Sequence, residues 1–189
     1  MQQVTKDTGR LDYQPKKFVV WLFVVASVIL FASLTSAYIV MRSQGRWLHF
    51  LLPGIFNIST FILISSSISL QGAYIAARRL KFGQEKLLLW LTFFLGICFL
   101  ISQWLAWRVL VHNGVFFSGN PSGSFLYVIS GFHAIHIIAG LFMLIYAISG
   151  AHRTILQAKN IYRIQIALIF WHFLDFLWIY LYVFLLLNQ

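Results

Sequence analysis

Charged residues divide this chain into five long apolar runs. Asp, Glu, Lys and Arg are absent from the first four runs, and the fifth contains one of them, Asp175. Each run exceeds the ~20 residues with which a helix crosses about 30 Å of hydrocarbon. The runs do not alternate between polar and apolar positions, as the strands of a membrane β-barrel would. We therefore predict an all-α, polytopic membrane protein, a bundle of five transmembrane helices at residues 18–41, 51–77, 87–107, 125–149 and 164–187.

The composition supports this prediction. Of the 189 residues, 60% are hydrophobic and 10% are charged, against about 25% charged in soluble domains. A soluble globule of this size could not bury so much apolar surface, which excludes soluble enzymes, disordered tails and secreted disulfide scaffolds. Residues 1–17 form a polar tail without a small-residue cleavage site, so we expect a retained first helix and no signal peptide. Residues 18–189 are predicted to form a single transmembrane domain.

The basic residues predict the orientation. The formal net charge is +10, and eleven of the fourteen Lys and Arg residues lie in the N-terminal tail or in the second and fourth loops. By the positive-inside rule, the N-terminus lies in the cytoplasm and the C-terminus in the periplasm. Because the bases stand at the ends of apolar runs, they do not indicate nucleic-acid binding. The longest outer segment, residues 111–124, contains three glycines and a proline and should form a structured turn.

Small residues on two runs predict close helix packing. In the second run they recur at every fourth position: Ser65, Ser69, Ala73 and Ala77. The first run has a shorter seam of Ser33, Ser36 and Ala37. Such seams let helix backbones approach one another in lipid, and we interpret them as contacts inside the bundle, not as a polar substrate path. Asn57 and Gln71 should hydrogen-bond across helices, and the single cysteine, Cys98, should be a packing residue.

The ionisable groups of the last two runs leave three interpretations open. His133 and His136 lie in the fourth run, and His172 and Asp175 share one helix face of the fifth. Two histidine-bearing helices could ligate haem or a metal, although His172 and His136 fit a single iron plane poorly, at ~12 Å and ~20 Å from the inner face. The second interpretation is a proton relay through His136, His172 and Asp175. In the third, these groups satisfy one another, or a lipid headgroup, within a packed bundle.

Two segments resemble specific motifs of a known family. Residues 123–136, GSFLYVISGFHAIH, are similar to the family pattern GSxFxxxTGFHGxH. Residues 170–178, FWHFLDFLW, are similar to its YWHFVDVVW signature. Supporting likenesses occur in the first two runs, in LFASLTSAY at residues 30–38 and in Leu52-Pro53 with the following Asn57 and serine run. The family is subunit III of the haem-copper oxidases, specifically cytochrome c oxidase subunit III.

The resemblance implies a non-catalytic subunit of a proton-pumping terminal oxidase, which reduces oxygen with electrons from cytochrome c in aerobic respiration. Members of the family bind no haem or copper themselves. They pack against the catalytic subunit I, hold phospholipids, and support proton uptake and durable turnover. Subunit II, other respiratory subunits and a respiratory supercomplex are the further partners that the resemblance implies.

The resemblance also implies an arrangement and leaves alternatives. This chain is similar to the last five of the seven helices in the family's long form, the short bacterial arrangement, and is expected in the bacterial inner membrane. The equivalent subunit of a quinol oxidase is one alternative, because the donor site lies on other subunits. A small transporter is an alternative of another class, and it would require an inverted repeat with broken helices, which the sequence lacks.

The candidate residues for lipid binding, partner contact or a polar network are Asn57, Gln103, His133, His136, His152, Arg153, Trp171, His172 and Asp175. No catalytic, cofactor-binding or metal-binding residue is expected from the resemblance. The chain departs from the family at three carboxylate positions, which it fills with Ser27, Ala106 and Gln165. Proton collection through those acids is therefore not expected here, and without the family's first two helices its lipid cleft lacks one wall.

Overall fold

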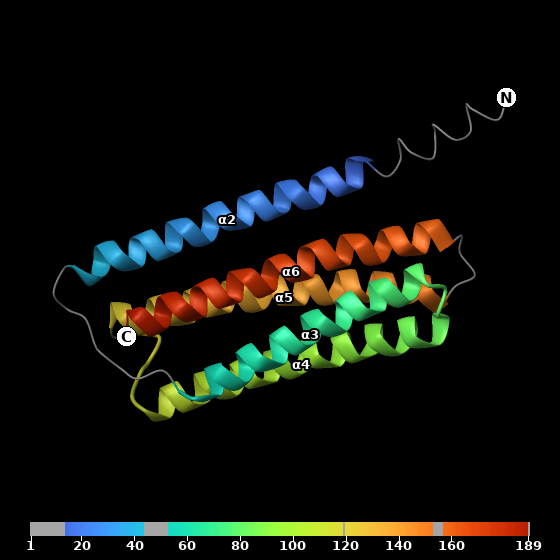
Figure 1. Cartoon of the computed structure of the whole chain (residues 1–189). Coiled ribbons are helices and arrows are strands. Elements are labelled where there is room, and N and C mark those ends of the chain that lie inside the picture. The colour runs from blue at the N-terminus through green and yellow to red at the C-terminus, as the bar shows by residue number, and fades with distance from the viewer. Residues whose placement is uncertain (1–13, 44–52, 119, 153–156, 189) are drawn as a thin grey trace.

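The described part of the chain forms five long helices packed side by side (Figure 1). The computed structural model describes residues 14–43, 53–118, 120–152 and 157–188. The helices within these residues are α2 (Gln14–Arg42), α3 (Ile55–Arg78), α4 (Phe82–His112), α5 (Pro121–His152) and α6 (Gln157–Leu187). All five are long and apolar enough to cross a membrane, and the described residues contain no strand. The predicted all-α class is confirmed.

Most of the helices extend beyond the predicted apolar spans. α4 begins at Phe82 and ends at His112, five residues outside the predicted span at each end. α3 is the exception at its start, because it begins at Ile55, two residues after Pro53. At ~1.5 Å per residue, the extra turns carry the helices past the hydrocarbon and into the headgroup region. The predicted spans were stretches without charged residues. They could not include these extra turns, because the turns carry charged residues such as Glu85 and Lys159.

The helices form two antiparallel pairs and one single helix. α3 packs most extensively against α4, and α5 against α6. The two pairs meet where α4 lies against α5 and α3 lies against α6. α2 packs against α5 and α6, on the side of the bundle away from α3 and α4 (Figure 1). The histidine-bearing helices α5 and α6 therefore occupy the centre of the bundle.

Trp171 of α6 lies at the meeting point of four helices. Its side chain is 1% exposed, and its indole Nε1–H donates to Ser66 Oγ on α3 at 2.9 Å. A β-carbon added at Gly96 of α4 would lie 2.8 Å from the indole ring, and one at Gly140 of α5 would lie 3.1 Å from it. The two glycines thus provide the space into which the indole fits.

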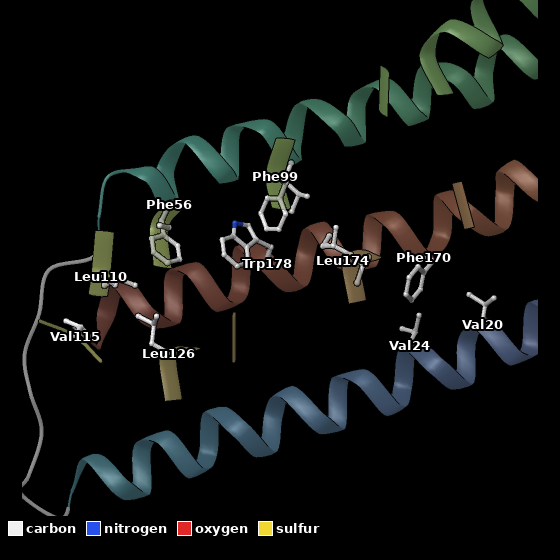
Figure 2. Packing of buried hydrophobic residues seen from close by; sticks show 13 residues of the cluster. Val20, Val24, Phe56, Phe99, Leu110, Val115, Leu126, Phe170, Leu174 and Trp178 are labelled. Atoms are coloured by element: carbon white, nitrogen blue, oxygen red, sulfur yellow. The ribbon is translucent and has the colours of Figure 1, made fainter. Parts of the chain in front are cut away.

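Trp178 anchors the other half of the core, two turns further along the same face of α6. Figure 2 shows its ring beside Phe56 and Phe99, and Phe170 lying toward Val20 and Val24 of α2. The Trp178 ring stacks on Phe56 with centroids 6.0 Å apart and meets Phe99 edge-on at 5.0 Å. Its indole N–H donates to Thr60 Oγ1 on α3 at 3.0 Å. Aromatic rings with satisfied N–H groups therefore hold α6 against α3 and α4.

The ends of α3 and α4 share a capping motif. After α3, the Lys81 N–H bonds the Ala76 carbonyl and the Leu80 N–H bonds the Ala77 carbonyl, with Leu80 in the left-handed region at φ 58°. After α4, Val115 and Gly114 make the corresponding bonds, and Gly114 has φ 81°. The two hydrogen bonds at each helix end satisfy the last helical carbonyls, and the position with positive φ usually holds glycine. The structured turn expected within residues 111–124 begins with the cap after α4.

The structure corrects two predictions about helix faces. The prediction of a packing seam on the first helix is wrong, because Ser33, Ser36 and Ala37 are all exposed on the surface of the bundle. The buried face of α2 instead carries one serine, Ser27, among larger residues: Val20, Val24, Phe31, Thr35 and Tyr38. Cys98, expected to pack inside, is exposed on α4. The four-residue seam of α3 lies inside the bundle as predicted, at the contact with α4, with Ser69, Ala73 and Ala77 buried and Ser65 half-buried.

Candidate functional site

His172 of α6 bonds two side chains of α3 within the apolar part of the bundle. Its Nε2 lies 3.3 Å from Gln71 Oε1, and its Nδ1 contacts Ser67 Oγ. The amide oxygen can only accept, so Nε2 carries a proton, and when the ring is neutral its Nδ1 accepts from the serine hydroxyl. The predicted bond of Gln71 across helices is confirmed, and Asn57 makes a similar one, accepting from Tyr182 of α6.

Asp175 lies one turn further along α6, beside His172. Its Oδ2 is 3.8 Å from His172 Nδ1, its side chain is buried, and neither carboxyl oxygen has a hydrogen-bond partner. A net charge inside the bilayer is costly, so the pair is expected to be neutral as a whole. Either the carboxyl group keeps its proton beside a neutral imidazole, or an imidazolium faces a carboxylate. The His172–Asp175 pair can therefore hold one exchangeable proton.

His136 of α5 belongs to a different contact. Its Nδ1 donates to the Phe132 carbonyl at 2.7 Å, and its Nε2 lies 3.1 Å from Ser27 Oγ on α2. Ser27 Oγ also lies 2.7 Å from the Phe23 carbonyl. The serine can therefore donate to a neutral imidazole, or accept from a protonated one while it donates to the carbonyl. The described contacts do not join His136 to Asp175, so the continuous row that the relay interpretation requires is not formed by direct bonds.

His133 is enclosed in the core without a polar partner. It is 0% exposed, and neither ring nitrogen has a hydrogen bond. Its ring lies 4.9 Å from that of Trp178 and contacts the edges of Phe99 and Phe31. The sequence suggested chemistry for this residue, but its surroundings are those of an aromatic packing residue.

Gln103 is also buried and without a partner at either amide atom. It lies on α4 between Phe99, which contacts His133, and Trp107, whose indole donates to Ser130 of α5 at 3.0 Å. Both flanking contacts are made with α5, so Gln103 occupies the same helix–helix contact. The α4–α5 contact thus contains two buried polar side chains that no described group satisfies.

The remaining candidate positions lie away from these contacts. His152 Nδ1 bonds the Ile148 carbonyl at the end of α5, at 3.0 Å. Ala106 is 0% exposed and Gln165 is half-buried. Arg153 lies outside the described residues. Ser27 and Ala106, two of the three positions at which the resemblance implies a family carboxylate, are therefore inside the bundle of this chain.

Sequence reasoning missed a buried polar cluster at one end of the bundle. Glu85, which the charge pattern placed in a loop, is 0% exposed in the first turn of α4. Its Oε1 accepts from Asn160 Nδ2 of α6 at 2.6 Å. Arg163, one turn after Asn160, lies 4.2 Å from the Tyr146 ring of α5. One acidic residue within an otherwise basic loop was the available signal.

Arg163 also lines an apolar groove on the surface of the bundle. The groove measures about 410 Å³ and lies between α2, α5 and α6, against Val20, Phe142, Met143, Tyr146, Ile166 and Ala167. A smaller hollow of about 180 Å³ adjoins it through Val20 and Met143. A cation at the end of an apolar groove has the chemistry that a phospholipid would match.

The described residues contain no group of three or more His, Cys, Asp or Glu side chains that could hold a metal ion. The polar groups lie instead as separate pairs: Ser27 with His136, His172 with Asp175, and Glu85 with Asn160. Each pair joins neighbouring turns or neighbouring helices. The arrangement can hold protons and fix helix positions, and it provides no set of converging catalytic groups.

Comparison with known proteins gives a consistent result. The sequence model of the family described as "Cytochrome c oxidase subunit III" matches residues 49–188. The chain is 29% identical over 172 residues to cytochrome c oxidase subunit 3 of Corynebacterium diphtheriae, covering 86% of this chain and 82% of the relative. It is 32% identical over 181 residues to cytochrome bo(3) ubiquinol oxidase subunit 3 of Buchnera aphidicola subsp. Schizaphis graminum, covering 92% and 94%.

The family match and the fold agree. The matched range contains α3 to α6, with His136 and the His172–Asp175 pair, and the alignment to one relative covers 95% of this chain and so extends over α2 as well. Five apolar helices and relatives from bacterial respiratory oxidases indicate a multi-pass bacterial membrane protein. The chain belongs to the cytochrome c oxidase subunit III family of the haem-copper oxidases.

Proposed function

We propose that this chain is the non-catalytic subunit III of a proton-pumping terminal oxidase and that it packs against subunit I. The family match over residues 49–188 is the observation that carries this proposal. The pairwise arrangement of its polar groups supports a role in assembly and stability, since they join helices to one another. Haem and copper would then reside in partner subunits.

Purification from native membrane tests the proposal. The chain should copurify with a haem-copper subunit I, identified by mass spectrometry, and the preparation should consume oxygen. Relatives of both kinds, cytochrome c oxidases and ubiquinol oxidases, match this chain. Oxidation of reduced cytochrome c, compared with oxidation of ubiquinol, identifies the electron donor. A preparation without a haem-copper subunit contradicts the proposal.

We propose that subunit I covers the outer face of α3 and α6 around Gln71. Gln71 is exposed, the His172 side chain is 33% exposed, and both line a shallow hollow of about 420 Å³ with Ser67. Polar groups that face lipid at this depth are costly. A partner helix with its own polar side chains would satisfy them.

Cysteine cross-linking tests this face. In a Cys98→Ser background, Gln71→Cys should cross-link to subunit I when a short bifunctional reagent is added. Ser36→Cys is the matched control, because Ser36 is an exposed small polar residue on α2, across the bundle. Cross-linking from position 36 and none from position 71 would place the partner on the α2 side.

We propose further that a phospholipid occupies the groove between α2, α5 and α6. Its acyl chain would lie along Val20, Phe142 and Met143, and its phosphate would meet the Arg163 guanidinium. Native mass spectrometry should find one phospholipid fewer in Arg163→Gln. Arg79→Gln, at an exposed arginine after α3, should retain the wild-type number. Equal lipid numbers in both variants would contradict the site.

A further inference from the structure

The last turns of α4 carry a cation and two indole rings along one face. A shallow hollow of about 410 Å³ is lined there by residues three or four positions apart in the helix: Trp104, Trp107, Arg108, Val111 and His112. Residues at these spacings are neighbours on the helix surface. The hollow lies at the end of the bundle where α4 ends and α5 begins, opposite the end at which α6 begins (Figure 1).

Arg108 gives this hollow a positive charge that no acidic side chain balances. Its guanidinium carbon lies 5.4 Å from the centroid of the Trp104 ring, in a cation–π contact. The sequence has no Asp or Glu between Glu85, in the first turn of α4, and Asp175, which lies beside His172 on α6. Within the described residues, Arg108 forms no ion pair. An anion from outside the chain would therefore complete this contact.

The exposed rings of α4 place the hollow at the depth of lipid headgroups. Trp90 is 41% exposed and Trp104 is 56% exposed, and they lie about 21 Å apart along the helix at ~1.5 Å per residue. The exposed residues between them are all apolar: Leu91, Phe94, Cys98 and Ile101. Tryptophan is enriched at both interfaces of a bilayer. Arg108, one turn beyond Trp104, therefore reaches the headgroup level next to an apolar helix face.

The chemistry of the hollow matches the phosphate of a lipid. A guanidinium binds phosphate through its charge and its parallel N–H groups, and the exposed imidazole of His112, one turn further on, can donate another hydrogen bond. The Trp107 indole is fixed by its bond to Ser130 of α5 at 3.0 Å, so this wall is formed before a ligand binds. The acyl chains of a bound lipid would continue along the apolar face below.

We propose that Arg108, Trp104 and His112 bind the phosphate of a phospholipid in the leaflet at this end of the bundle. By the positive-inside rule this is the outer leaflet. The site lies on a different helix, and at the opposite end of the bundle, from the groove that Arg163 lines. It is independent of which subunits accompany the chain.

Native mass spectrometry of the chain, purified with the subunits that accompany it, tests the site. Arg108→Gln should retain one phospholipid fewer than wild type, and Arg108→Lys, which keeps the charge, should retain the wild-type number. The Arg108→Gln/Arg163→Gln double variant should lose two, so each lipid site can fail without the other. An unchanged number in Arg108→Gln would overturn the proposal.

The Trp104 ring gives a second readout with a matched control. Trp104→Leu removes the ring under the guanidinium and should lower the fraction of molecules that retain this lipid. Trp90→Leu makes the same change at the other end of α4 and should leave that fraction unchanged. Equal retention in the two variants would contradict the role of Trp104.

A cryo-EM map of the same preparation locates the ligand. Lipid density is expected along α4, with its phosphate oxygens about 2.7–3.2 Å from the Arg108 guanidinium nitrogens. An acidic side chain of an accompanying subunit in the hollow would overturn the proposal, and so would a hollow that contains water alone.

Discussion

The packing around Trp171 leaves no room for a methyl group added at Gly96 or Gly140. Its indole is held on one side by the bond to Ser66 and on the others by Gly96 and Gly140. The ring cannot move away from an added group without breaking that bond. Extra atoms in a core packed in this way cost about 1–3 kcal/mol.

We therefore expect Gly96→Ala to lower the melting temperature of the purified protein in detergent by an amount that corresponds to about 1–3 kcal/mol. Its β-carbon would lie 2.8 Å from the indole. Gly83→Ala, in the first turn of the same helix, is the control, because a β-carbon there meets nothing within 4 Å. Equal melting temperatures for the two variants would show that Trp171 has room to shift.

The acidic side chains Asp175 and Glu85 differ in their partners, which predicts different reactivity. Asp175 has no hydrogen bond, whereas Glu85 accepts one from Asn160. A hydrophobic carbodiimide, which reacts with protonated carboxyl groups, should label Asp175 and spare Glu85. Peptide mass mapping of wild type and of Asp175→Asn measures this. Labelling of Glu85 alone would mean that the Asp175 carboxyl is ionised and paired with an imidazolium.

At the level of secondary-structure elements, two helices end in the same cap with different residues at the same position. Leu80 and Gly114 both have positive φ, at 58° and 81°. A residue with a β-carbon pays about 1–2 kcal/mol there, and glycine avoids this cost. The turn after α3 therefore contains strain that the turn after α4 does not.

Gly114→Ala should destabilise the protein by about 1 kcal/mol, and Leu80→Gly should stabilise it by less than about 1 kcal/mol. The stabilisation is smaller because glycine also increases the entropy of the unfolded chain. Leu80 is 59% exposed, so little packing is lost. Thermal unfolding of both variants against wild type provides the measurement. A stabilising Gly114→Ala would contradict the role of the cap.

For the whole molecule, orientation follows from the distribution of basic residues. The turn between α3 and α4 carries Arg78, Arg79 and Lys81, all exposed. It lies at the same end of the bundle as the start of α6, whereas the C-terminus lies at the other end (Figure 1). The positive-inside rule places the basic end in the cytoplasm.

A topology reporter fused after Gln189 should therefore report a periplasmic position. The same reporter inserted within residues 78–86 should report a cytoplasmic one. Alkaline phosphatase, active in the periplasm, and green fluorescent protein, fluorescent in the cytoplasm, give opposite signals at each site. A cytoplasmic signal after Gln189 would contradict the five-span topology.

The sequence by itself determined the number and type of the helices and the family. Runs without charge can span a membrane only as helices, because lipid offers no partner for backbone polar groups. The motifs at residues 123–136 and 170–178 lie in α5 and α6, the helices that the fourth and fifth apolar runs predicted. The seam on α3 was predictable because small residues at a spacing of four mark one helix face.

Only the tertiary structure decided which polar groups meet. One of the three interpretations joined His136 and His172 to Asp175, but His136 bonds Ser27 on α2 while His172 bonds α3. Glu85 is buried against Asn160, 75 residues further along the chain. Periodicity gives the face of a helix and not its rotation toward neighbours, and partners across helices depend on that rotation. Packing against α5 and α6 likewise determined that α2 buries Phe31 and Thr35 and leaves Ser33 exposed.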